Sequence, residues 1–306
     1  MVIITGNAHE YLMNSLLKNG YQVHYAPEIS YEELSEIIPA AEGLIVTTRL
    51  QIDKTIIDKA ENLKWIGRLG SGLELIDTAY AEKKNITWVS SPEGNRNAVA
   101  EHALGMLLNL LNNITKAAAE VKEGLWVRDA NRGIELSGKT IGIIGYGNTG
   151  QALAKLLSAF DVTILVYDKY KQNFGGKEAR EANMEQICRY ADVISFHVPL
   201  TTDTTNMADE SFFNALLRKP VIINTSRGAV INTNALVNAI KSYQVSGAAL
   251  DVLENENIKN LSATQQELFN FLCSHNQVLL TPHIAGYSQE AFLKMSQILL
   301  KKLGIN

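Results

Sequence analysis

Short apolar runs alternate with longer segments of helical periodicity along almost the whole chain. The runs are rich in Ile and Val and lack polar alternation, which is typical of strands buried on both faces of a parallel sheet. The predicted strands are 2–5, 22–26, 43–48, 64–70, 86–91, 140–147, 163–168, 192–199, 221–226, 247–252 and 277–282. Helices are predicted between them, among others at 10–20, 32–42, 53–63 and 151–160.

A long helix is expected at 97–120, because this segment is too apolar for a helix that lies only at the surface. A polar, loop-like stretch follows at 130–139, and the alternation of strands and helices then begins again. We therefore expect an α/β protein with two doubly wound, Rossmann-like parallel-sheet domains, one on each side of the long helix. The polar stretch 254–276 is expected to carry one helix outside the second sheet.

Length and composition agree with two domains. The chain has 306 residues, of which 46% are hydrophobic, enough for two cores. A net charge of -4, with acidic and basic residues mixed throughout, argues against a nucleic-acid or membrane surface. We expect a cytoplasmic protein, since the chain shows neither a signal-peptide pattern nor an apolar run of membrane-spanning length. Cys188 and Cys273 lack metal-ligand spacing, so we expect no metal and interpret both as small buried residues.

A glycine-rich turn stands between the predicted strand at 140–147 and the helix at 151–160. The pattern Gly145-x-Gly147-x-x-Gly150 is weak alone, but in this strand–turn–helix context it indicates a dinucleotide site. The pyrophosphate is expected at the helix N-terminus, where unpaired N–H groups favour anions. Asp168 ends the next strand and is expected to accept hydrogen bonds from the adenosine ribose, which favours NAD over NADP. Lys169 follows directly and weakens this exclusion of NADP.

Three later strand ends carry groups suited to chemistry on a hydroxy acid. Arg227 follows one strand, and its planar fork matches a carboxylate, although an isolated arginine is more often an ordinary surface residue. Acidic residues follow the next strand, and Glu254 is also compatible with a solvated loop. His283 follows the last strand and is suited to accept a hydroxyl proton, although histidines in such places often only cap a strand. Together these residues predict a site for a 2-hydroxy acid.

The same segments resemble the D-isomer-specific 2-hydroxyacid dehydrogenase family in matching order along nearly the whole chain. The similar segments are "GRLGSGLELID", "NAVAEHALGMLL", "GIELSGKTIGIIGYGNTG", "FHVPLTTDTTNM", "INTSRGAVINTNALVNAI", "GAALDVLENE" and "LLTPHIAG". The resemblance implies a substrate-binding domain made of 1–96 and 286–306, with an NAD-binding domain, 97–285, inserted into it.

The resemblance also implies roles for individual residues. It implies that Arg227 binds the substrate carboxylate, that His283 is the acid–base and that Glu256 supports His283. The implied cofactor-binding residues are Gly145, Tyr146, Gly147, Asn148, Thr149, Gly150, Asp168, His197, Val198, Pro199, Thr204, Thr225, Ser226, Arg227, Asp251, His283, Ala285 and Gly286. His197 is thereby placed near the adenosine, whereas His9, His24, His102 and His275 are interpreted as structural. The implied substrate-binding residues are Arg49, Ser71, Gly72, Arg227 and His283.

The sequence departs from the family in three places, and several alternatives stay open. One departure is that the segment between Glu256 and His283 is longer than usual. Asn257 stands where the family commonly has proline, so Glu254 competes with Glu256 for the supporting role; Leu75 replaces a common asparagine. The expected activity is that of a 3-phosphoglycerate dehydrogenase without an appended regulatory domain, with Arg49 or Arg96 near the phosphate. The alternatives are a glyoxylate, hydroxypyruvate or other 2-oxo acid reductase and, in another class, an NAD-sensing, corepressor-like binding protein. A homodimer built around the helix at 97–120 is also expected.

Overall fold

The computed structural model describes residues 1–176 and 178–305, which divide into two compact units. The first unit comprises Met1–Arg96 and Tyr287–Asn306, and the second comprises Asn97–Gly286. In the described part of the chain, no helix is long and apolar enough to cross a bilayer.

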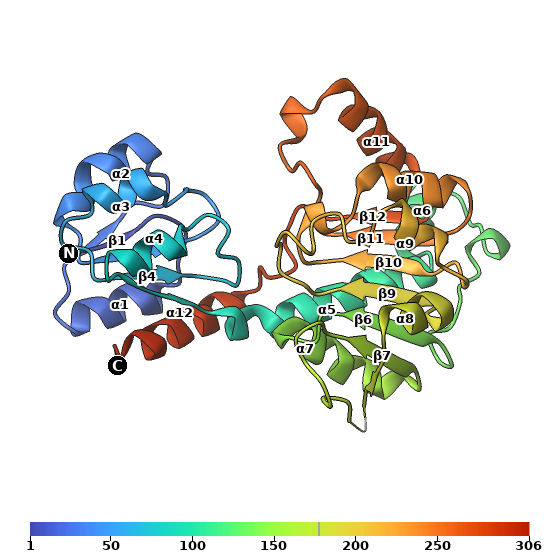
Figure 1. Cartoon of the computed structure of the whole chain (residues 1–306). Coiled ribbons are helices and arrows are strands. Elements are labelled where there is room, and N and C mark those ends of the chain that lie inside the picture. Colours follow the sequence, from blue (N-terminus) through green and yellow to red (C-terminus); the bar gives the residue numbers. More distant parts are fainter. Residues whose placement is uncertain (177, 306) are drawn as a thin grey trace. The chain divides into compact units, whose positions relative to one another are not determined.

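The first unit is a five-stranded parallel sheet with helices on both faces (Figure 1). Its strand order β2-β1-β3-β4-β5 is that of doubly wound flavodoxin-like folds. Residues of α2, η1, α3 and α4 form one apolar core with the sheet, while α12 contacts β4 and β5, so that Leu299 packs against Gly67. The elements are β1 Val2–Ile4, α1 Glu10–Lys18, β2 Val23–Tyr25, α2 Tyr31–Ile37, η1 Ile38–Ala40, β3 Gly43–Val46, α3 Lys54–Lys59, β4 Trp65–Arg68, α4 Thr78–Lys83, β5 Thr87–Ser90 and α12 Gln289–Leu303.

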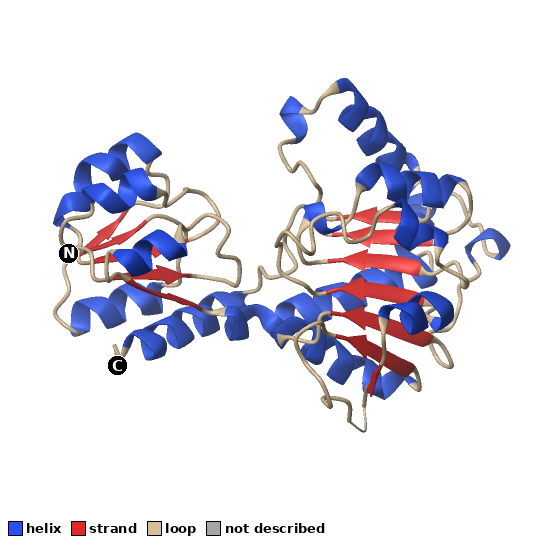
Figure 2. Ribbon diagram, viewed as in Figure 1, coloured by secondary structure: helices blue, strands red, loops and turns tan. Residues whose placement is uncertain are grey.

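The second unit is a seven-stranded sheet in which all strand pairs are parallel (Figure 2). Its order is β12-β11-β10-β9-β6-β7-β8. Strands β6, β7 and β8 follow one another towards one edge, and β9 to β12 follow one another towards the other edge, so the strand order reverses between β6 and β9. The strands are β6 Thr140–Ile144, β7 Thr163–Tyr167, β8 Arg180–Glu181, β9 Val193–Phe196, β10 Val221–Asn224, β11 Gly247–Leu250 and β12 Val278–Leu280. The helices are α5 Pro92–Leu111, which begins before the boundary between the units, α6 Ile114–Lys122, η2 Asp129–Asn131, α7 Asn148–Leu157, η3 Ser158–Phe160, α8 Met184–Tyr190, α9 Glu210–Asn214, η4 Gly228–Val230, α10 Thr233–Lys241, η5 Ile258–Asn260 and α11 Ala263–Ser274.

Alternate residues of these strands enter different cores. Ile222 packs in the core that contains α8, α9 and α10, whereas Ile223 packs in the core that contains α5 and α7. Both residues are fully or almost fully buried. This two-sided burial is the physical reason for the unbroken apolar runs in the sequence.

The structure confirms the two-sheet α/β architecture and corrects three details of the prediction. The long helix expected at 97–120 is two helices, α5 and α6, separated by Asn113 in the left-handed conformation with φ 54°. Asparagine tolerates that conformation better than most residues, so the chain turns there. Cys188 is buried as expected, but Cys273 on α11 is exposed, because this helix lies at the edge of the unit with one face in solvent. The strand β8 was not predicted at all.

Candidate active site

The predicted functional segments of the second unit all follow strands of one parallel sheet. Because parallel strands end at the same edge, the loops after β6, β7, β9, β10, β11 and β12 lie along a single side of the sheet. The reversal of strand order between β6 and β9 opens a crevice at this edge in folds of this type. The glycine turn follows β6 and His197 follows β9, so both flank the reversal point.

The glycine turn has the geometry that a bound pyrophosphate requires. Gly145 has φ +94°, and a Cβ there would lie 2.5 Å from the carbonyl oxygen of His197. A Cβ on Gly150 would lie 2.1 Å from the carbonyl oxygen of Gly145, so only glycine permits this packing. Gly147 faces open space and precedes α7, whose first turn has no side-chain cap. The uncapped N–H groups of α7 therefore fit an anionic group, as the NAD pyrophosphate requires.

Asp168 links the end of β7 to the glycine turn. Its carboxylate accepts hydrogen bonds from the backbone N–H of Tyr146 at 2.9 Å and of Tyr170 at 3.0 Å. Each carboxylate oxygen has a second lone pair, so the group still has capacity to accept from a ribose hydroxyl. The side chain thus has a fixed position beside the glycine turn, as expected of a ribose-binding residue.

His197 is a buried link between β9 and α7. One ring nitrogen lies 2.8 Å from Ser195 Oγ and the other 3.1 Å from Thr149 Oγ1. Burial lowers the pKa of His197 to about 4, so the ring is neutral at physiological pH. The ring therefore supports the N-terminal turn of α7 and does not act as an acid–base. The following turn is held by Thr204 Oγ1, which donates to the carbonyl of Pro199 and accepts from the N–H of Thr201.

Arg227 sits on a turn that Asn224, the last residue of β10, holds in place. The Asn224 side chain is 1% exposed; its oxygen accepts from the N–H and the hydroxyl of Ser226, and its nitrogen donates to the carbonyl of Arg227. One Arg227 nitrogen donates to the carbonyl of Ser226 at 2.7 Å. The buried hydroxyl of Thr225 has no hydrogen-bond partner among the described residues. An unsatisfied buried hydroxyl at this edge is consistent with a polar ligand group there.

Asp251, at the end of β11, holds the turn that carries His283. Its carboxylate, 1% exposed, accepts from the hydroxyl of Thr281 at 2.6 Å and from the N–H groups of Ile284 and Ala285 at 2.9 and 2.8 Å. His102 on α5 also reaches this turn, with Nε2 3.0 Å from Thr281 Oγ1. The buried carboxylate is therefore already hydrogen-bonded to the protein, which adds a structural role to the expected contact with the nicotinamide.

Glu256, not Glu254, meets His283. Oε2 of Glu256 lies 2.9 Å from Nδ1 of His283, whereas Glu254 accepts a hydrogen bond from the N–H of Thr233 at the start of α10. A carboxylate can only accept, so in the neutral form of the ring Nδ1 carries the proton and Nε2 has the free lone pair. The histidine thus presents a proton-accepting nitrogen on the side away from Glu256.

The expected substrate residues of the first unit lie on two loops of its sheet. Arg49, an exposed residue after β3, donates to the carbonyl of Ile29 at 2.5 Å. Ser71 and Gly72 follow β4, and the buried Arg68 donates to the carbonyl of Gly72 at 2.9 Å and also to that of Leu69. Arg68 therefore shapes the loop that offers the N–H groups of Ser71 and Gly72. Arg96 is exposed on α5.

Sequence reasoning did not identify Asn224 and Arg68 as residues that hold these loops, and it interpreted His102 as structural without identifying its partner. Asn224 and Arg68 are the last residues of β10 and β4 and fall within the predicted strands 221–226 and 64–70. A polar residue in an otherwise apolar run needs hydrogen-bond partners, which was an available signal. His102 gave no such signal, because its partner Thr281 is 179 residues away in the sequence.

A doubly wound unit with a glycine turn, a carboxylate fixed beside that turn and an Arg–Glu–His set is typical of nicotinamide-dependent dehydrogenases. Residues 104–285 match the model of the "D-isomer specific 2-hydroxyacid dehydrogenase, NAD binding domain". The chain belongs to this family, and NAD is the cofactor of the matched domain.

Two curated relatives and one solved structure illustrate the similarity. D-3-phosphoglycerate dehydrogenase of Archaeoglobus fulgidus is 33% identical over 304 residues, which are 99% of this chain and 56% of that protein. Hydroxypyruvate reductase of Thermotoga maritima is 34% identical over 95% of this chain and 94% of its own length. D-lactate dehydrogenase of Aquifex aeolicus, solved with NAD and lactic acid, superposes with a TM-score of 0.86 at 25% identity and covers 99% and 94% of the two chains. The chain thus spans about half the length of the similar phosphoglycerate dehydrogenases.

Proposed function

We propose that the protein is an NAD-dependent oxidoreductase that interconverts a small D-2-hydroxy acid and its 2-oxo acid. The observation that carries this proposal is the hydrogen bond between Glu256, on the loop after β11, and His283, on the loop after β12. Arg227 lies on the loop after β10, the other neighbour of β11 in the sheet. Bound NAD supplies the hydride acceptor. Nε2 of His283 takes the hydroxyl proton, Glu256 stabilises the resulting imidazolium, and Arg227 binds the carboxylate through its planar fork.

The substrate that we propose is 3-phosphoglycerate, with 3-phosphohydroxypyruvate as its oxidised form. The phosphoglycerate dehydrogenases among the relatives support this choice, and Arg49 or Arg96 is proposed as the phosphate-binding cation. The hydroxypyruvate reductase has a similar identity and covers nearly the whole of both chains, so hydroxypyruvate or glyoxylate is the second candidate. In either case Ser71 and Gly72 are proposed to bind the substrate carboxylate through their N–H groups.

The remaining cofactor contacts are proposed from the position of each residue around the crevice. Asp168 is proposed to bind the adenosine ribose and to disfavour NADP by repelling its 2′-phosphate. Thr225, Asp251, Ala285 and Gly286 are proposed to surround the nicotinamide, and the turn from His197 to Thr204 is proposed to border the adenosine.

A panel of 2-oxo acids, assayed for NADH oxidation, tests the proposal and ranks the substrates. The panel contains 3-phosphohydroxypyruvate, hydroxypyruvate, glyoxylate and pyruvate, and NADH binding is measured in parallel by fluorescence. Turnover that is fastest with 3-phosphohydroxypyruvate supports the phosphoglycerate assignment. Tight NADH binding without turnover of any of these acids, or of the reverse substrates, would instead favour an NAD-sensing binding protein.

We also propose a homodimer and a cytoplasmic location. The support for a dimer is a group of exposed apolar side chains in and after α6, which comprises Ile114, Val121, Leu125, Trp126, Val127 and Ile134. Isolated monomers seldom expose so many large apolar side chains within so short a segment. The proposed contact therefore centres on residues 114–134 and not on α5 itself.

A further inference from the structure

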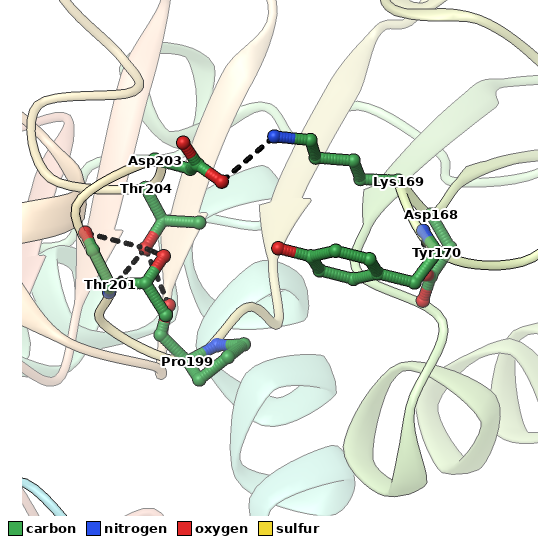
Figure 3. A network of polar contacts seen from close by, with 7 residues as sticks. All are labelled: Asp168, Lys169, Tyr170, Pro199, Thr201, Asp203 and Thr204. Atoms are coloured by element: carbon green, nitrogen blue, oxygen red, sulfur yellow. Dashed lines mark hydrogen bonds and ion pairs between the residues drawn. The ribbon is translucent and has the colours of Figure 1, made fainter.

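An exposed ion pair joins the two loops that flank the proposed adenosine side of the cofactor site. Nζ of Lys169, just after β7, lies 2.8 Å from Oδ2 of Asp203, in the turn after β9 (Figure 3). Lys169 immediately follows Asp168, the residue proposed to disfavour NADP. A lysine in this position can pair with the 2′-phosphate of NADP. An ion pair between this lysine and a protein carboxylate therefore bears on the preference between NAD and NADP.

The residues before and after Lys169 are fixed by contacts with the protein. The Asp168 carboxylate accepts hydrogen bonds from the N–H groups of Tyr146 and Tyr170, and these bonds restrict the backbone conformation at Lys169. The Lys169 ammonium also lies 5.9 Å from the centre of the Tyr170 ring. The next lysine, Lys171, donates to the carbonyl of Tyr146 at 2.5 Å. The two lysines closest in sequence to Asp168 are thus both bound to protein groups.

Asp203 lies in a hydrogen-bonded turn and is positioned to hold the Lys169 ammonium in the ion pair. It lies in the turn braced by Thr204, whose hydroxyl bonds to Pro199 and Thr201, as Figure 3 shows. The Lys169 ammonium lowers the pKa of Asp203, and Asp203 raises the pKa of Lys169, so both groups are charged at neutral pH. A negative charge on a fixed turn therefore faces the lysine.

We propose that Asp203 is a specificity-determining residue, which strengthens the preference for NAD by engaging Lys169 and keeping its charge from the 2′-phosphate of NADP. The proposal rests on the preference for NAD that Asp168 is proposed to give. Asp168 repels the 2′-phosphate, and a free Lys169 next to it would offset part of that repulsion. Asp203 removes this compensation through its hydrogen bond to Lys169.

Asp203 could instead repel the 2′-phosphate directly, and a double-mutant cycle separates the two routes. The variants are Asp203→Asn, Lys169→Met and the double variant, with Glu210→Gln as a control. Glu210 is an exposed acid on α9 in the same unit, so its substitution makes the same change in net charge at another place. The dissociation constants of NADH and NADPH are measured by fluorescence titration at low ionic strength, because salt screens exposed charges.

The expected result is a change in the ratio of the two dissociation constants in one variant only. Asp203→Asn should tighten NADPH relative to NADH by roughly fivefold, as expected for one exposed charge, with NADH affinity nearly unchanged. In the Lys169→Met background the same substitution should change nothing, and Glu210→Gln should behave like the wild type.

The proposal is overturned if Asp203→Asn leaves the ratio unchanged, or if its effect persists without Lys169 or is matched by Glu210→Gln. A wild-type protein that binds NADPH as well as NADH would refute the preference proposed for Asp168. The role of Asp203 is judged only by the shift between variants, so the two failures can be distinguished.

Discussion

Nδ1 of His283 lies 2.9 Å from Oε2 of Glu256, and the His283 backbone that makes this contact has φ +55°. Such a left-handed conformation is unfavourable for a residue with a side chain, so the surrounding structure must hold it. The N–H of His283 donates to the carbonyls of Asp251 and Thr281, and the Asp251 carboxylate binds the next two N–H groups. The strain is therefore located at the residue proposed to carry the chemistry.

His283→Ala should lower kcat by about 10²- to 10⁴-fold, because the substitution removes the proposed proton acceptor. The affinity for NADH should change little, since the glycine turn and Asp168 are untouched. Steady-state kinetics and fluorescence titration measure the two quantities. Glu256→Gln, which keeps the size of the side chain but not its charge, should lower kcat by at least about tenfold. A variant at His283 with nearly full turnover would refute the acid–base role.

Asn224→Ala should mainly raise KM for the 2-oxo acid, because the turn that presents Arg227 loses its three hydrogen bonds to Asn224. We expect an increase of roughly tenfold, which corresponds to a loss of about 1.4 kcal/mol. Asn224→Asp is the comparison, since it keeps the acceptor for Ser226 but replaces the donor with a carboxylate oxygen that faces the carbonyl of Arg227. Its KM should also be raised, because that oxygen repels the carbonyl of the turn. A fall in stability with unchanged KM in both variants would assign Asn224 a purely structural role.

His197 should make the protein less stable as the pH falls from 6.5 towards 4. Its pKa is lowered to about 4 in the folded protein, so between these values the unfolded state binds the proton and the folded state does not. Stability therefore rises with pH through this window, by up to roughly 3 kcal/mol for this one group. Urea unfolding at pH 4.5 and 7 should show a smaller difference for His197→Gln than for the wild type. His24→Gln, which removes an exposed histidine on β2, should leave the difference unchanged.

The sequence contained most of the information about the fold because two-sided burial leaves a strong apolar signal. Ile222 and Ile223 are both buried, so the β10 run is readable without any knowledge of the neighbouring strands. The glycine turn was equally readable, since Gly145 and Gly150 are required by close backbone contacts that any larger residue would prevent.

The supporting contacts of the site could not be predicted, because they join residues distant in sequence or depend on turn geometry. The choice between Glu254 and Glu256 depends on which carboxylate the loop after β11 directs to His283, and spacing alone does not determine this. The break at Asn113 interrupts an otherwise continuous helical pattern. Asparagine also occurs within helices, so its presence alone does not predict a helix break. The exposure of Cys273 depends on where α11 lies, which composition does not reveal.

Trp126→Asp should convert the proposed homodimer into monomers. The Trp126 side chain is 80% exposed and lies among other exposed apolar residues of 114–134. A partner subunit would bury this side chain, and an aspartate in its place would bury an unpaired charge, which is unfavourable. Leu217→Asp is the matched control, because Leu217 is 67% exposed in the same unit, in the loop after α9. Size-exclusion chromatography with light scattering should show a dimer for the wild type and the control, and a monomer for Trp126→Asp. If the wild type is a monomer at micromolar concentrations, or the Trp126 variant stays dimeric, residues 114–134 do not form the interface.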